Sequence, residues 1–172
     1  MGVGEGMRTF GAMKRVWSGR SVTLGVKREL YERIVVPTVM YGSESWGMRV
    51  EERNKLDVAE MNCLRSMCGV TRWDRWRNEV VRERVGVPES LSKRVDRKVL
   101  KWFGHVERMG GERLTKRVYM SEVRGERGRG RPPFRWMDGV RKACAEREMG
   151  LGEARGMCRD RNEWRRMTDR IV

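Results

Sequence analysis

The residues best suited to chemistry are five basic side chains in the stretch 91–109. They recur at intervals of three and four residues, and they are Arg94, Lys98, Lys101, His105 and Arg108. On one helix this spacing places them along a common edge, about a quarter-turn from the apolar face. Because one edge of the helix would carry so much positive charge, we expect this stretch to contact an anion.

The sequence offers little material for catalysis or metal binding. His105 is the only histidine, so no histidine-pair metal site and no Ser/His/Asp triad with a spare base can form. No Asp-Asp pair occurs, whereas a polymerase needs aspartates on neighbouring strands to hold two Mg²⁺ ions. The cysteines lack the close spacing of zinc sites, and we expect reduced, mostly buried thiols at Cys63, Cys68, Cys144 and Cys158. We therefore expect no enzyme activity, no metal and no cofactor.

The charge of the chain indicates the class of partner. Among 172 residues there are 39 Lys and Arg against 24 Asp and Glu, a net charge of +15. Such an excess on a soluble chain favours nucleic acid as partner over a membrane or a small-molecule substrate. No apolar run approaches the ~20 residues of a membrane span, and the N-terminus has no apolar secretory signal. We expect an intracellular protein, nuclear or cytoplasmic.

Two more basic segments could contact nucleic acid. Trp73 and Trp76 stand among arginines, an arrangement that suits stacking on unpaired bases. The second segment is rich in Arg, Gly and Pro and predicts a flexible solvated loop; its candidate contacts are Arg124, Arg127, Arg129, Arg131 and Arg135. Its Arg-Gly-Arg-Pro sequence resembles an AT-hook core, which leaves three interpretations open: a basic linker, a phosphate-binding arm, or a reader of A·T-rich minor grooves.

Apolar periodicity predicts that helices position these residues, so the expected fold class is all-α. The expected helices cover residues 7–17, 23–41, 51–68, 71–86, 91–109, 114–120 and 134–149, and a last one begins at 160. Thr23, Ser90 and Asp160 are the predicted N-caps of three of them. Pro37 should kink the second helix, for which a strand around Val35 and Val36 is the competing prediction. The glycines at 150, 152 and 156 predict a loosened stretch.

The same periodicity predicts which side chains face the core. In residues 91–109 the apolar stripe is Leu91, Val95, Val99, Trp102, Val106 and Met109. Earlier in the chain the expected inward residues are Leu30, Ile34, Met40, Leu56, Ala59, Cys63, Leu64 and Met67, with Trp73, Trp76 and Val80 sharing a side. Tyr41 and Trp46 should fold back as aromatic anchors. Lys27 and Glu60 are expected to face solvent.

Ordered sequence blocks resemble the C-terminal region of RTE-like, non-LTR (LINE-type) retrotransposon reverse transcriptases. The anchor is Trp102 to Met109, read as Trp-Phe-Gly-His-Val-Glu-Arg-Met, which resembles the family's WFGHVxRM block. Matches in the same order are Leu30-Tyr31 with Pro37 and Tyr41 to Trp46, Asn62 to Val70, Asp74 to Glu79, Gly130 to Val140, and Asp160 to Trp164. A CCHC knuckle, present in some relatives, is absent here.

The resemblance implies a thumb and C-terminal region without the catalytic palm, whose YADD or FADD motif is missing. The implied division is a disordered N-terminus, a thumb-like helical part, a basic helical part, the Arg/Gly loop and C-terminal helices, at 1–6, 7–70, 71–120, 121–133 and 134–172. In a complete family member, an RNA-directed DNA polymerase, this region is implied to grip RNA template and DNA target. A palm encoded elsewhere would then be a partner. Two alternatives stay open: a stand-alone A·T-preferring DNA-binding protein, and a translated retrotransposon relic without a role.

Overall fold

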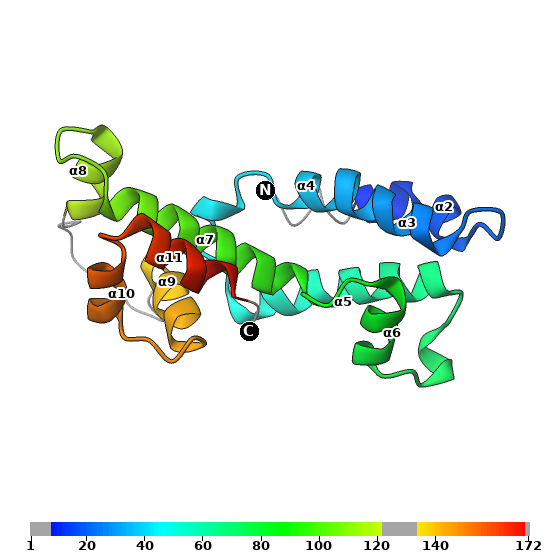
Figure 1. The fold of residues 1–172 in the computed structure, drawn as a ribbon. Helices are drawn as coiled ribbons and strands as arrows, with labels where there is room; N and C mark the ends of the chain where they lie inside the picture. The colour runs from blue at the N-terminus through cyan, green and yellow to red at the C-terminus, as the bar shows by residue number, and fades with distance from the viewer. Residues whose placement is uncertain (1–7, 122–133, 171–172) are drawn as a thin grey trace, which may run out of the picture. The chain divides into compact units, whose positions relative to one another are not determined.

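The computed structural model describes residues 8–121 and 134–170, and within them the chain is all-α, as predicted (Figure 1). The chain divides into two compact units. Unit 1 is described over residues 8–43 and 49–95, and unit 2 over 44–48, 96–121 and 134–170. The finer division predicted from the sequence stays a prediction. No helix in the described ranges combines the length and apolar character of a membrane span.

Unit 1 is built mainly on one long helix with shorter helices packed on it. Residues 8–12 are helical, and the elements that follow are α2 (Lys14–Ser18), α3 (Leu24–Leu30), η1 (Tyr31–Val35), α4 (Val36–Val39), α5 (Val50–Cys68), η3 (Arg72–Asp74), α6 (Asn78–Val85) and the start of α7 (Leu91–Glu107). Two helices end where the sequence predicts, because Gly69 and Gly86 adopt the left-handed conformation that favours glycine.

The predicted helix over 23–41 is confirmed, and the competing strand is wrong. The Thr23 hydroxyl accepts a hydrogen bond from the Val26 amide and caps α3. The expected disturbance at Pro37 takes the form of a π turn just before it, in which the Val36 amide donates to the Tyr31 carbonyl. The inward face differs from the predicted one: Tyr31 and Val35, spaced i, i+4, are buried, whereas Leu30 is half-buried and Ile34 is exposed.

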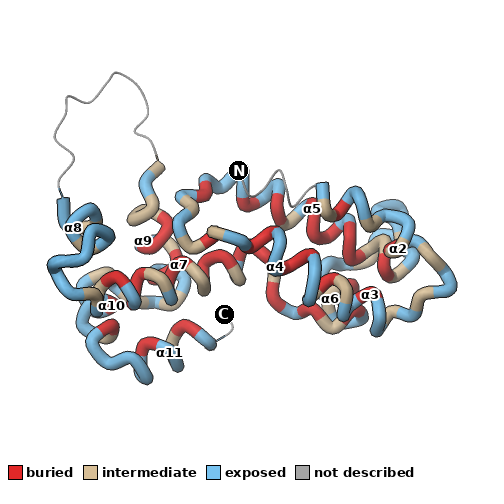
Figure 2. Tube along the Cα trace, turned by 90° about the horizontal axis from the view of Figure 1, so that it is seen from above, coloured by how far each residue is buried: buried red, intermediate tan, exposed pale blue. Residues whose placement is uncertain are grey.

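Figure 2 shows buried residues recurring along α5. Glu60, expected on the solvated face of this helix, is fully buried in unit 1, and that prediction is wrong. Its carboxylate accepts hydrogen bonds from the Tyr31 hydroxyl at 2.6 Å, the Arg82 guanidinium at 2.6 Å and the Leu91 amide at 3.1 Å. Burial, together with the Glu60 charge, raises the pKa of Tyr31 well above its ordinary value. These partners lie 22 to 31 residues away in sequence, so helical periodicity gave no sign of them.

Two more orientation predictions in unit 1 are wrong, those for Tyr41 and Lys27. Tyr41 is 85% exposed and, like Ile34 at 45%, does not pack inward. Lys27 is buried, and its ammonium donates to the carbonyl of Met67 in the last turn of α5 at 3.4 Å. A lysine can be buried there because the free carbonyls at a helix C-terminus accept its hydrogen bond and favour its charge. By contrast, the predicted inward residues of α5 are all buried: Leu56, Ala59, Cys63, Leu64 and Met67.

Unit 2 packs short helices around the C-terminal two-thirds of α7. Its other helices are α8 (Leu114–Met120), α9 (Trp136–Ala145), α10 (Leu151–Met157) and α11 (Arg161–Asp169), and the 3-10 turn η2 is Ser43–Ser45. Gly152 and Gly156 lie inside α10, so the loosened stretch predicted there is wrong. Helix α10 is stabilised by burial of Ala154 rather than by propensity, which is why its glycines misled the prediction.

The core of unit 2 confirms most of the predicted stripe of α7. Val99 and Val106 are buried as expected, but the buried aromatic side chain is Phe103 and not Trp102, which is only half-buried. The Phe103 ring contacts those of Trp136 and Trp164 at centroid distances of 6.3 and 5.8 Å. Three aromatic rings from three helices thus fix where α9 and α11 lie on α7.

Candidate functional site

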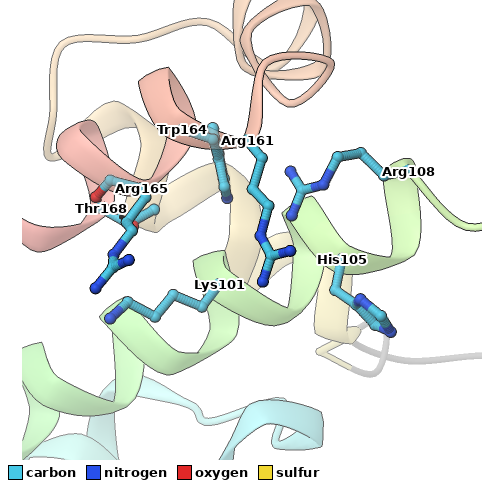
Figure 3. A pocket seen from close by; sticks show the side chains of 7 residues that line it. All are labelled: Lys101, His105, Arg108, Arg161, Trp164, Arg165 and Thr168. Carbon is cyan, nitrogen blue, oxygen red and sulfur yellow. Dashed lines mark hydrogen bonds between the residues drawn. The ribbon is translucent and has the colours of Figure 1, made fainter.

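A groove of about 490 Å³ lies between α7 and α11 in unit 2 (Figure 3). It is lined by Lys101, His105, Arg108, Arg161, Trp164, Arg165 and Thr168. Figure 3 shows the first three side chains rising from α7 and the others coming from α11, with the guanidinium of Arg161 pointing toward α7. Four of the lining residues are Lys or Arg, and none of the described residues that line it is acidic.

Helix geometry explains why these cations converge. Lys101, His105 and Arg108 follow one another at i, i+4 and i+7 and therefore share an edge of α7. Arg161 and Arg165 are spaced i, i+4 on α11, which begins after Asp160. The Asp160 carboxylate accepts hydrogen bonds from the Asn162 and Glu163 amides, so the predicted cap is confirmed and fixes the start of α11.

The close approach of α11 to α7 depends on a glycine. The Trp164 indole lies directly on the backbone at Gly104, where an added Cβ would be 2.1 Å from the indole Nε1. The same Nε1 donates a hydrogen bond to the Leu100 carbonyl at 3.0 Å. Gly104 sits in the middle of a helix, where glycine is normally unfavourable, because only a hydrogen atom fits under this ring.

The groove keeps part of its positive charge unpaired. The Lys101 ammonium lies 2.6 Å from the Asp169 carboxylate, and Arg165 lies 3.6 Å from the same residue. Hydrogen bonding to Lys101 holds the pKa of Asp169 below its ordinary value. Arg108 donates to the carbonyl of Cys158 at 2.8 Å, and Arg161 has no carboxylate partner within the described residues. Asp169 therefore pairs with only two of the four groove cations, and the site can accept an anion with several oxygens.

The structure brings together only part of the predicted basic edge. Lys101, His105 and Arg108 line the groove, whereas Arg94 lies in unit 1 and makes a two-pronged ion pair with Glu32, both hydrogen bonds 2.7 Å long. Lys98 lies 3.6 Å from Glu44 and does not line the groove. The residues of the basic edge therefore have two roles: Arg94 forms an ion pair within unit 1, whereas Lys101, His105 and Arg108 line the groove.

The other predicted contact residues lie elsewhere. Arg135 is exposed at the N-cap of α9, and the four loop arginines Arg124, Arg127, Arg129 and Arg131 fall outside the described residues. Trp73 and Trp76 lie in unit 1, the first exposed and the second half-buried under Arg84.

The sequence prediction missed Arg161 and Arg165. Their spacing after a capping aspartate was visible and predicts a helix with both side chains on one face. What was not visible is that Trp164 turns this face toward the basic edge of α7. The sequence gives no sign that Trp164 packs on Gly104, because the two residues are 60 positions apart.

The described residues thus define an all-α, strongly basic chain with a cationic groove. It is 29% identical over 149 residues to a transposon-derived, uncharacterized protein of Caenorhabditis elegans, in a match that covers 81% of this chain. The chain spans about half the length of that curated relative, 52%. No protein-family model and no solved structure matches. The chain is therefore similar to a transposon-derived protein, which agrees with the transposon part of the predicted resemblance.

Proposed function

We propose that the chain binds the phosphodiester backbone of nucleic acid in the α7/α11 groove. The observation that carries the proposal is the convergence of Lys101, Arg108, Arg161 and Arg165 on one open groove. Arginine and lysine side chains at this density neutralise phosphates and release counterions, which makes binding tolerant of sequence and sensitive to salt. The net charge of +15 supports the same partner.

The proposal extends to the origin of the chain, as part of the C-terminal region of a non-LTR retrotransposon reverse transcriptase. It is supported by the ordered blocks described above and by similarity to a transposon-derived protein. In this role the chain grips RNA template or DNA target inside the cell, and a catalytic palm supplies polymerisation. We propose that the chain itself does not polymerise, because its sequence holds no Asp-Asp pair.

The test is a fluorescence-anisotropy titration of labelled single-stranded RNA, single-stranded DNA and duplex DNA at several salt concentrations. The variant carries Arg161→Ala with Arg165→Ala, which removes two groove cations on exposed side chains. For single strands each phosphate contact contributes about 0.7 to the slope of log affinity against log salt. Loss of two contacts should lower the slope by about 1.4 and the affinity at 0.1 M salt by roughly 25-fold.

A matched control removes the same charge from the same unit outside the groove. Arg141→Ala with Lys142→Ala does so on α9, where both residues pair with neighbouring carboxylates. This control should bind nearly as the unmodified chain does. If control and groove variant lose affinity equally, the charge acts only as a diffuse field and the groove is not the site. If the folded chain binds no nucleic acid, the relic alternative is correct.

A further inference from the structure

A tryptophan in unit 1 stands almost entirely in solvent. Trp73 is the middle residue of the 3-10 turn η3 and is 90% exposed, more than any other large hydrophobic side chain among the described residues. Tryptophan normally buries its ring, so an indole held in water without packing on its own unit is available to a ligand.

The turn that carries Trp73 is held in place on both sides. The Asp74 carboxylate accepts hydrogen bonds from the Thr71 amide at 2.6 Å and from the Thr71 hydroxyl at 2.7 Å. After the turn Arg75 adopts a left-handed conformation with φ of 54°, and its amide donates to the Arg72 carbonyl. Because the backbone is already ordered, a ligand that stacks on the ring has little backbone freedom to remove.

The neighbouring tryptophan has a different position. The guanidinium of Arg84 lies over the Trp76 ring, 5.4 Å from its centroid, and therefore covers one face of that ring. The Trp76 carbonyl accepts a hydrogen bond from Arg65, which also donates to Asn78. Trp76 is thus part of the support of the segment, whereas Trp73 makes no ring contact with any described residue.

Arginines lie close to Trp73 in the chain, one before it and two after it. Arg72, Arg75 and Arg77 are all exposed, and none of the three has a carboxylate partner in the part of the chain that the structure describes. A lone aromatic ring bordered by charged side chains is unlike the apolar centre of a protein interface. It does match single-stranded nucleic-acid sites, which combine aromatic rings for the bases with basic side chains for the phosphates.

We infer that Trp73 stacks on an unpaired base while Arg72, Arg75 and Arg77 contact the adjoining phosphates. The ligand is a single-stranded segment or an unpaired end of RNA or DNA. This site lies in unit 1, whereas the α7/α11 groove lies in unit 2. The Trp73 site binds the face of a base, and the groove binds phosphates. It gives the chain a preference for single strands over duplex that charge alone does not produce.

The test compares Trp73→Ala and Trp73→Phe with Tyr41→Ala, an exposed aromatic control in the same unit at 85% exposure. Binding of a labelled single-stranded oligonucleotide is measured by anisotropy, and 2-aminopurine placed in the strand reports stacking by its fluorescence. Trp73→Ala should weaken binding by about 5-fold or more and reduce the 2-aminopurine quenching, because stacking on one aromatic ring contributes about that much. Trp73→Phe should retain most of the affinity, because a smaller aromatic ring can still stack on a base. Tyr41→Ala should leave both the affinity and the quenching unchanged.

An oligonucleotide of abasic residues separates base stacking from charge. On this strand Trp73→Ala and the unmodified chain should bind equally, and the salt slope should be the same for both. Equal losses on abasic and base-containing strands, or no loss on either, would overturn the inference. Thermal unfolding followed by circular dichroism should be unchanged in Trp73→Ala, because the side chain is exposed. The groove variant should change the salt slope on the abasic and on the base-containing strand alike. The experiment can therefore refute the Trp73 site without refuting the groove, and the groove without refuting the Trp73 site.

Discussion

Replacing Gly104 with alanine tests the contact that holds α11 on α7. The new Cβ would lie 2.1, 2.4 and 2.9 Å from three atoms of the Trp164 ring, all below any normal contact distance. Any shift of the ring would break its present contacts, because it is buried, packs on Phe103 and donates to the Leu100 carbonyl. The tryptophan must therefore leave its site or α11 must move away.

The expected free-energy change has three parts. Overpacking costs about 1–3 kcal/mol, and leaving the buried indole N–H without its acceptor costs about 1–3 kcal/mol. Alanine in place of glycine inside a helix stabilises the helix by about 1 kcal/mol, which offsets part of this loss. We therefore expect Gly104→Ala to lower the free energy of unfolding by about 1–5 kcal/mol, measured by urea denaturation followed by circular dichroism.

The same substitution at Gly156 is the control, since it lies in helix α10 with no atom within 4 Å of an added Cβ. It should be neutral or stabilise by up to about 1 kcal/mol. In a Trp164→Ala background Gly104→Ala should no longer be destabilising, because the clashing ring is gone. If Gly104→Ala behaves like Gly156→Ala in the unmodified chain, the proposed packing of α11 is refuted. Gly104→Ala should also weaken nucleic-acid binding, because α11 carries Arg161.

Two other perturbations probe the fold. Glu60→Ala should destabilise the chain by about 3–5 kcal/mol in urea denaturation, because it leaves the Arg82 guanidinium without its buried partner; Glu51→Ala, on an exposed residue, should have little effect, and equal losses would contradict the network. Backbone hydrogen bonds, first from the Glu163 amide, hold the pKa of Asp160 below its ordinary value, so its stabilisation is complete above the unfolded pKa of about 3.9 and is lost as pH falls through the lowered pKa. Asp160→Asn should therefore remove part of the acid dependence of thermal unfolding below about pH 4, and an unchanged profile would refute this role of the cap.

Much of the local structure could be predicted because it depends on neighbours in sequence. The caps at Thr23 and Asp160 use side chains that bond to amides two or three residues ahead, and the stop at Gly69 uses the freedom of one glycine. Helix periodicity identified the buried face of α5 for the same reason. The order of the sequence blocks likewise indicated a transposon origin, which agrees with the similarity to a transposon-derived protein.

Predictions were wrong where one side chain had two plausible environments. Glu60 reads as a surface residue in a helix pattern, yet three donors from distant segments surround it. Trp102 and Phe103 are adjacent aromatic residues, and the choice of which one is buried depends on the positions of α9 and α11. Arg94 and Lys101 share one edge of α7, but Arg94 forms a partly buried ion pair with Glu32 in unit 1.

The sequence by itself determined that the chain is helical, strongly basic and equipped with a positively charged edge on α7. These properties follow from composition, from periodicity and from bonds between close neighbours. Only the tertiary structure decided which cations form a site, because Trp164 rests on Gly104 and so places Arg161 and Arg165 beside Lys101 and Arg108. Contacts between residues far apart in the chain form only when the helices pack together. Helical periodicity describes single helices, so it cannot predict these contacts.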